Sequence, residues 1–303
     1  MTGPAPLSPG RLPLVRLIVG LLAYGLLGFS LAQLAAILLF SAAGWAGGPV
    51  EAWSKDPVTG SIFLAGIAIS LGFIPANIFV GARVFRLTPA DLRWTRTGHP
   101  WRGSLLAFGL GIGLAALAMG LAALLGSARW TPDDGDLAAY LTRVGWILLM
   151  LAPAALAEEV MFRGVPIVAL DRTLGRGVAV GVTALAFALT HMGNLSVTTL
   201  SIGNICVAGM LLGIVFFAPG GIWTAAGLHL GWNWAQAAMD APVSGLALRI
   251  PFINYDPGYP AWLTGGPFGP EGGVLATLVL GGATVLAARK YLAHQLPDRE
   301  SRP

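Results

Sequence analysis

Residues 17–40 read LIVGLLAYGLLGFSLAQLAAILLF, an apolar run of 24 positions without a charged side chain. A helix needs about 20 predominantly apolar residues to cross the hydrocarbon core of a bilayer, so this run is long enough to do so. It is also too long for the apolar core of a signal peptide, and no convincing small-residue cleavage site follows it. We therefore expect a retained transmembrane helix.

The same pattern recurs along the chain. The expected spans are 14–41, 61–83, 104–126, 138–161, 177–195, 199–218, 221–241 and 272–289. Continuous apolar runs predict helices, because a helix satisfies all of its own backbone groups in lipid. The expected fold is an all-α, polytopic transmembrane helix bundle with about eight membrane-spanning helices.

The composition agrees with this class. Only 11% of the residues are charged, where soluble domains carry about 25%. The net charge of +4 does not indicate a nucleic-acid partner, because the basic residues flank the apolar runs. The single cysteine, Cys206, excludes an internal disulfide and a cysteine metal cluster, and we expect a small buried side chain.

Charge alternates between the loops and predicts the orientation. Arginines cluster before the first span, between the second and third, after the fourth and after the last, whereas the alternate loops are acidic or nearly neutral. Because cytoplasmic loops carry the excess of Lys and Arg, both termini should be cytoplasmic. The amino-acid composition is rich in Ala, Gly, Leu and Arg and includes only two lysines, which suggests a bacterium with high genomic GC content. We therefore expect the protein in a bacterial plasma membrane.

We expect five segments. They are a disordered cytoplasmic tail at 1–13, N-terminal transmembrane helices at 14–136, a catalytic helical core at 137–242, an outer loop at 243–271, and the last helix with a basic tail at 272–303. Nothing in the outer loop looks catalytic.

Ionisable residues inside a span cost about 2.5–3.5 kcal/mol each on insertion scales, so they are candidates for function. Glu158 and Glu159 are adjacent on a helix and point about 100° apart, given 3.6 residues per turn. Glu159 can pair with Arg163 at i,i+4, which leaves Glu158 free to act as a general base on a water. The alternative is that both acids only mark the cytoplasmic end of the span.

Two further polar pairs lie on later apolar segments. Phe187 and His191 share a helix face, as do His229 and Asn233. Two hydrogen-bonding side chains on one stripe of an apolar helix favour a polar cavity. A hydrogen-bonded clamp between two helices is the alternative for His229 and Asn233.

The three motifs Glu158-Glu159-x-x-x-Arg163, Phe187-x-x-x-His191 and His229-x-x-x-Asn233 lie in this order on separate apolar helices. Together they resemble the CPBP family, the CAAX-prenyl protease type II and bacteriocin-processing membrane proteases, also called the Abi family. The resemblance covers residues 140–242, about a third of the chain.

The resemblance implies an intramembrane endopeptidase. By it, Glu158 and His191 would activate the hydrolytic water, while His229 and Asn233 would stabilise the oxyanion. Glu159 and Arg163 would hold the first motif in shape, and Phe187 would support the second. The implied partners are membrane lipid and a hydrophobic or lipidated peptide or protein substrate, and the oligomeric state is left open.

The cofactor is an open question at this stage. Family members are described both as metalloproteases and as metal-independent glutamate proteases, and Glu158, His191 and His229 could hold a zinc ion. No His-Glu-x-x-His motif is present, and we favour the metal-independent reading. Two other functions stay open: an ion- or proton-coupled transporter, and a non-catalytic membrane immunity or scaffold protein.

One geometric conflict follows from the expected spans. Glu158 would lie near the cytoplasmic end of the fourth span, and His191 toward the outer end of the fifth. They can meet only if a helix extends or breaks. We therefore predict that the fourth helix extends or kinks near Gly164 and Pro166, because proline disrupts the helical hydrogen-bond ladder.

Overall fold

The computed structural model describes residues 13–55, 60–94 and 100–291. The described helices are α1 (Leu14–Ala46), α2 (Gly48–Lys55), α3 (Gly60–Val80), α4 (Pro100–Leu124), α5 (Leu137–Arg163), α6 (Val165–Leu174), α7 (Arg176–Thr190), α8 (Thr199–Phe216), α9 (Ile222–Ala238), α10 (Ala261–Thr264) and α11 (Val274–Tyr291). A π-helical turn, Gly81–Phe85, follows α3, and two 3₁₀ turns, Gly266–Phe268 and Pro270–Gly272, precede α11. Most of the tail expected at 1–13 lies outside the described residues.

The predicted all-α bundle is confirmed. Among the described residues, six helical segments are long and apolar enough to cross a membrane: Leu14–Ala46, Gly60–Phe85, Trp101–Leu124, Leu137–Leu174, Thr199–Phe216 and Val274–Tyr291. The chain is accordingly an integral membrane protein. The expected count of eight is not confirmed, because α7 and α9 have only 15 and 17 residues.

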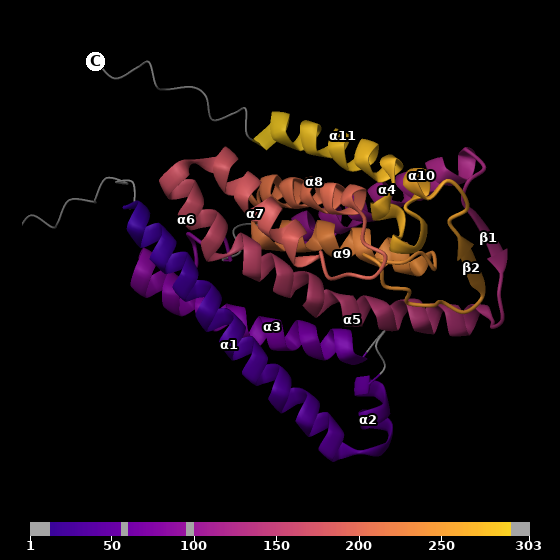
Figure 1. The fold of residues 1–303 in the computed structure, drawn as a ribbon, viewed down its shortest axis with the longest axis horizontal. Coiled ribbons are helices and arrows are strands. Elements are labelled where there is room, and N and C mark those ends of the chain that lie inside the picture. Colours follow the sequence, from indigo (N-terminus) through magenta and orange to yellow (C-terminus); the bar gives the residue numbers. More distant parts are fainter. Residues whose placement is uncertain (1–12, 56–59, 95–99, 292–303) are drawn as a thin grey trace, which may run out of the picture.

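The helices pack around α8 and α9 (Figure 1). α9 packs against α4 and α5, and α8 packs against α7 and α11. α3 leans on the other side of α5, and α1 covers α3. Close approach of α4 and α9 depends on glycine, because a Cβ at Gly231 would lie 2.1 Å from the carbonyl oxygen of Phe108.

The predicted break in the fourth span is confirmed. α5 ends at Arg163 and α6 begins at Val165, with Gly164 between them and Pro166 in the first turn of α6, where a missing N–H costs nothing. The Asn77 side chain fills the break, because its Oδ1 accepts a hydrogen bond of 2.6 Å from the Val165 amide.

The segment expected as an outer loop is more ordered than its sequence suggested. Within it, β2 (Ile253–Asp256) pairs antiparallel with β1 (Arg129–Pro132), in a register that sets Trp130 opposite Tyr255. Leu248 and Ile250 pack in one apolar cluster with Ile147 and Leu151 of α5. The 243–271 segment is therefore part of the folded bundle.

Candidate active site

The predicted division of the two glutamates is visible in α5. Glu159 is fully buried, and its Oε1 accepts a hydrogen bond of 3.0 Å from Nη1 of Arg163, one turn later. The other end of the guanidinium donates to the carbonyl oxygen of Gly209 on α8 at 2.9 Å. The Arg163 guanidinium carbon also lies 4.8 Å from the centre of the Phe187 ring, within range of a cation–π contact. Arg163 thus joins α5 to α7 and α8.

Glu159 also holds His229. Nδ1 of His229 donates to Oε1 of Glu159 at 3.0 Å, because a carboxylate oxygen can only accept. This contact was not predicted, since sequence spacing paired His229 with Asn233 on its own helix. It fixes the imidazole ring so that Nε2 faces away from Glu159.

Glu158 is turned away from the Glu159–Arg163 pair. Its side chain is 29% exposed, and its Oε2 lies 3.8 Å from Nε2 of His229, beyond hydrogen-bond distance. Oε2 is buried and has no hydrogen-bond partner among the described residues. Oε2 of Glu159 and Nε of Arg163 are also buried without a partner, but Glu158 differs from both because its side chain makes no hydrogen bond to any described residue and lines the cavity.

His191 lies at the end of α7, and its orientation is fixed by the backbone. Its Nδ1 donates to the carbonyl oxygen of Phe187 at 2.8 Å, so in the neutral ring Nε2 carries the free lone pair. Its ring centre is 4.7 Å from that of Phe187, which also contacts His229 at 5.8 Å. Phe187 therefore spaces the two imidazoles.

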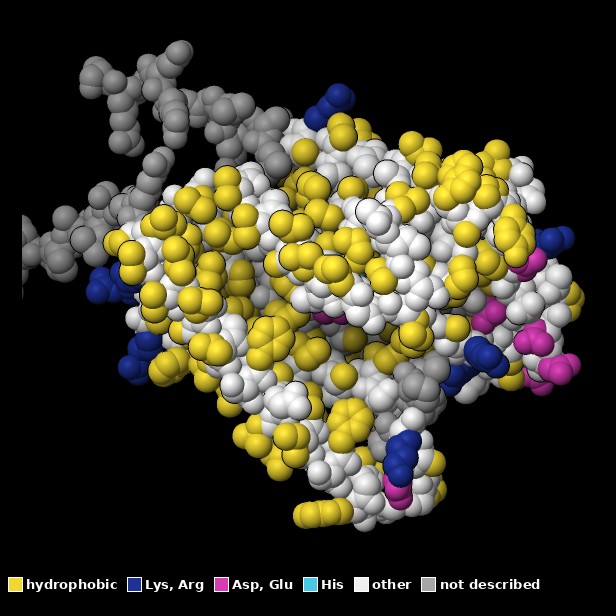
Figure 2. Space-filling view, in the orientation of Figure 1, with side chains coloured by type: hydrophobic (Ala, Val, Ile, Leu, Met, Phe, Trp, Pro, Cys, Tyr) yellow, Lys and Arg dark blue, Asp and Glu magenta, His cyan; other side chains and the backbone are white. Residues whose placement is uncertain are grey.

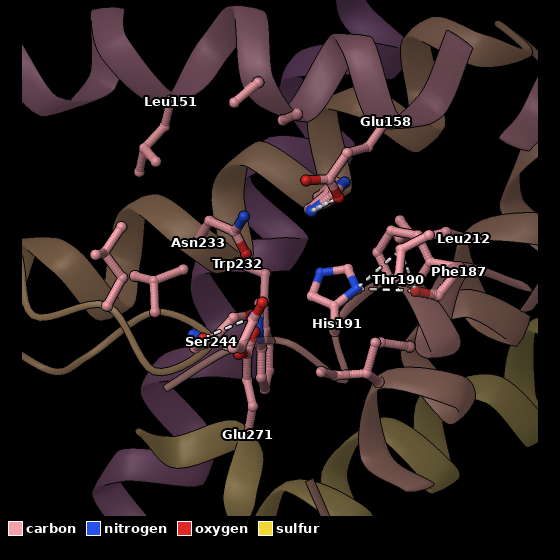
Figure 3. Close-up of a pocket in the computed structure, with 18 of the residues that line it drawn as sticks. Leu151, Glu158, Phe187, Thr190, His191, Leu212, Trp232, Asn233, Ser244 and Glu271 are labelled. Atoms are coloured by element: carbon pink, nitrogen blue, oxygen red, sulfur yellow. Dashed lines mark hydrogen bonds and ion pairs between the residues drawn. The ribbon is translucent and has the colours of Figure 1, made fainter. Parts of the chain in front are cut away.

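One cavity of about 600 Å³ is lined by five of the predicted side chains: Glu158, Phe187, His191, His229 and Asn233. In Figure 3, Glu158 comes from α5 above, His191 faces it across the open space, and Asn233 points in from α9. The remaining walls are mainly apolar and include residues of α1, α3 and α8. A hollow with acidic surface at its floor is visible between α3 and the α7–α9 region in Figure 2.

Glu158 and His191 line the same cavity, although the expected spans placed them toward opposite ends of their helices. α7 rises about 22 Å over its 15 residues at 1.5 Å per residue, less than the roughly 30 Å hydrocarbon core. α7 is therefore shorter than a full span, and it contacts α5. The conflict that the expected spans created is resolved in this way.

A third carboxylate was missed. Glu271, just before α11, is only 7% exposed and lines the same cavity with Ser244 and Trp232. It belongs to the segment in which no catalytic residue was expected. An isolated acid next to the start of an apolar span was the only signal for it in the sequence.

The donor atoms do not form a ready-made metal site. Among the residues that the structure describes, no three His, Cys, Asp or Glu side chains are placed so that they could hold a metal ion.

Comparison with known protein families gives a match for the central part of the chain. Residues 140–235 match the family model described as Type II CAAX prenyl endopeptidase Rce1-like. The match spans all three motifs, and it confirms the resemblance predicted from them. No curated protein and no solved structure matches the chain.

Proposed function

We propose that the chain is an intramembrane endopeptidase that hydrolyses a peptide bond of a hydrophobic or lipidated membrane-associated substrate. The observation that carries the proposal is the position of Glu158, a carboxylate without a hydrogen-bond partner that shares one cavity with His191, His229 and Asn233. The similarity of residues 140–235 to type II CAAX prenyl endopeptidases supports it.

The proposed mechanism begins with a water between Glu158 and His191. Glu158 removes a proton from the water, and Nε2 of His191 accepts a hydrogen bond from it and orients its lone pair toward the peptide carbonyl carbon. The new C–O bond produces a tetrahedral oxyanion. When the C–N bond breaks, the proton held by Glu158 passes to the leaving nitrogen, so the products are a carboxylic acid, whose hydroxyl keeps the second proton of the water, and an amine, and Glu158 is again a carboxylate.

His229 and Asn233 are proposed to stabilise the oxyanion. Glu159 accepts from Nδ1 of His229 and, as a carboxylate, favours the protonated ring, whose Nε2–H then points toward the cavity. The Asn233 amide supplies a second donor. Donors fixed in advance in a water-poor site are worth about 10²–10³-fold in rate each.

The proposal extends to placement in the membrane. The catalytic core is assigned to residues 137–242, and the protein to a bacterial plasma membrane with both termini cytoplasmic. The described chain ends support this orientation, because the start of α1 and the end of α11 lie at the same end of the bundle (Figure 1). Arg16 of α1 bonds to the π-helical turn that contains Arg83, and Lys290 is in the last turn of α11.

The test is cleavage of hydrophobic peptides, with and without a lipid modification, by the full-length protein in nanodiscs. Glu158→Gln should lower kcat by about 10²–10⁴-fold, the usual range for losing a general base. His191→Ala and His229→Ala should also lose most of the activity. Cleavage that survived all three substitutions would refute the mechanism.

Two further experiments distinguish this mechanism from a metalloprotease and from a transporter. A strong chelator should leave the rate unchanged, and chelator-sensitive activity restored by zinc would replace the metal-independent mechanism with a metalloprotease. If no peptide is cleaved but proteoliposomes show ion flux that Glu158→Gln abolishes, the protein is a transporter.

A further inference from the structure

The charged side chains that line the cavity are all acidic or histidine. Glu158 and Glu271 are its two carboxylates, and no Lys or Arg is among its described lining residues. They approach from opposite sides, with His191 and Asn233 between them (Figure 3). A substrate segment in the cavity therefore lies between two carboxylates.

Glu271 is held firmly in the cavity wall. Its Oε1 accepts from Nε1 of Trp232 at 2.8 Å and from Nε2 of Gln236 at 3.3 Å. Its Oε2 accepts from the amide and the hydroxyl of Ser244, at 2.8 and 2.6 Å. Every partner is neutral, and no ion pair to Glu271 occurs among the described residues. The hydrogen bonds thus fix the carboxylate without cancelling its charge.

The one guanidinium of the first motif does not offset these charges. Arg163 is fully buried and is already bound to Glu159 and to the Gly209 carbonyl, and it lies against the face of Phe187. It compensates Glu159, and no Lys or Arg of the described residues pairs with Glu158 or Glu271, so one protonated His229, 3.8 Å from Glu158, leaves the cavity with a net negative charge. In a site of low dielectric, charges interact over longer distances than in water.

We propose that this cavity selects peptide segments that are cationic or uncharged and rejects segments that carry a carboxylate, with Glu271 as a specificity-determining residue. The inference rests on the proposed function and deepens it by naming the substrate class. A free C-terminal carboxylate close to the scissile bond is then unfavourable in this cavity. The favoured substrate places its carboxyl terminus outside it.

The test measures binding, so that it does not depend on cleavage. The peptides share one uncharged apolar sequence with blocked ends and a single Lys, Gln or Glu in the middle, and a fourth peptide has a free carboxyl terminus. Binding is measured by fluorescence anisotropy with His191→Ala protein in nanodiscs of zwitterionic lipid. This variant keeps both carboxylates and does not consume the peptide.

The Lys peptide should bind about tenfold or more tightly than the Glu peptide, and the blocked Gln peptide more tightly than the free acid. Glu271→Gln should reduce the Lys-to-Glu ratio several-fold. Ser244→Ala is the matched control, because it removes one hydrogen bond to Glu271 and keeps the charge, so the ratio should persist.

Equal binding of the Lys and Glu peptides, or tighter binding of the free acid, overturns the inference. So does a ratio that Ser244→Ala lowers as much as Glu271→Gln, because the effect is then one of packing. These outcomes leave the proposed function intact if wild-type protein cleaves the Gln peptide. Conversely, a charge preference in binding without cleavage upholds the inference and refutes the endopeptidase.

Discussion

At the scale of single residues, two adjacent glutamates of one helix have opposite environments. Glu159 is fully buried and bound by both Arg163 and His229, whereas Glu158 makes no hydrogen bond within the described part of the chain. The first arrangement stabilises the fold, and the second leaves a carboxylate available for chemistry. Substitution of Glu159 should therefore mainly lower stability, whereas substitution of Glu158 should mainly lower activity.

Glu159→Gln should destabilise the protein far more than Glu158→Gln. Removing one partner of a buried ion pair leaves the other charge uncompensated, which costs about 3–5 kcal/mol. Glu158→Gln removes no hydrogen bond and should leave the midpoint of thermal unfolding nearly unchanged. Tryptophan fluorescence during heating in detergent measures both variants, and similar midpoints for the two would contradict this division.

The sequence could predict contacts between residues that are close along the chain, but not contacts between residues that are far apart in it. Glu159 and Arg163 are one turn apart, so helical spacing was enough to pair them. His229 is 70 residues from Glu159, and Glu271 is 39 residues from Trp232, so neither contact leaves a local pattern. The three motifs identified five residues that line the cavity, whereas the place of Glu271 in its wall came only from the fold.

At the scale of elements, the joint between α5 and α6 sets the position of the site. The Asn77 amide group of α3 donates to the carbonyl oxygens of Phe73 and Val160 and to the Tyr24 hydroxyl oxygen, while its Oδ1 accepts from Val165. Gly164 and Pro166 predicted the break from local chemistry. They could not predict that α3 supplies the buried side chain that satisfies it.

Gly164→Ala should therefore disrupt the joint. A Cβ at Gly164 would lie 1.9 Å from Oδ1 of Asn77 and 2.6 Å from the Val160 carbonyl oxygen, so the Asn77 contacts must break or α5 must shift. We expect a loss of about 1–3 kcal/mol from the unsatisfied polar groups, together with a lower kcat.

Gly145→Ala on the same helix is the control, because nothing lies within 4 Å of its new Cβ. It should be neutral or slightly stabilising, since Ala favours a helix over Gly by about 0.5–1 kcal/mol. Unfolding midpoints and peptide cleavage rates for the two variants test the joint. If Gly164→Ala behaves like Gly145→Ala, the close contact with Asn77 does not constrain the protein.

At the scale of the whole molecule, charge is distributed between the two ends of the bundle. Arg172 is in the last turn of α6 and Arg176 begins α7, and these two helices join at the end of the bundle that carries the chain termini (Figure 1). Acidic side chains gather near β1 and β2 at the other end (Figures 1 and 2). Composition and hydropathy were sufficient to predict a polytopic bundle. They were not sufficient to predict how α1 and α3 pack beside α5, or that α7 and α9 have only 15 and 17 residues.

This distribution predicts the orientation in the membrane, because basic loops stay in the cytoplasm. Ala90 lies in the exposed turn next to Asp91, which pairs with Arg172 at the basic end, and Asp134 lies in the exposed acidic turn before α5. In a Cys206→Ser background, Asp134→Cys should react with a membrane-impermeant maleimide in spheroplasts. Ala90→Cys should react only after permeabilisation.

Ala90→Cys and Asp134→Cys are controls for one another. Both positions are exposed in short turns, but they lie at opposite ends of the bundle. Labelling of Ala90→Cys in intact spheroplasts, with Asp134→Cys protected, would reverse the orientation. The cavity would then be oriented toward the opposite face, and the substrate would have to be sought on that side. Labelling as expected places the Glu271 segment toward the outer face, where a substrate segment that leaves the cavity beside Ser244 would emerge.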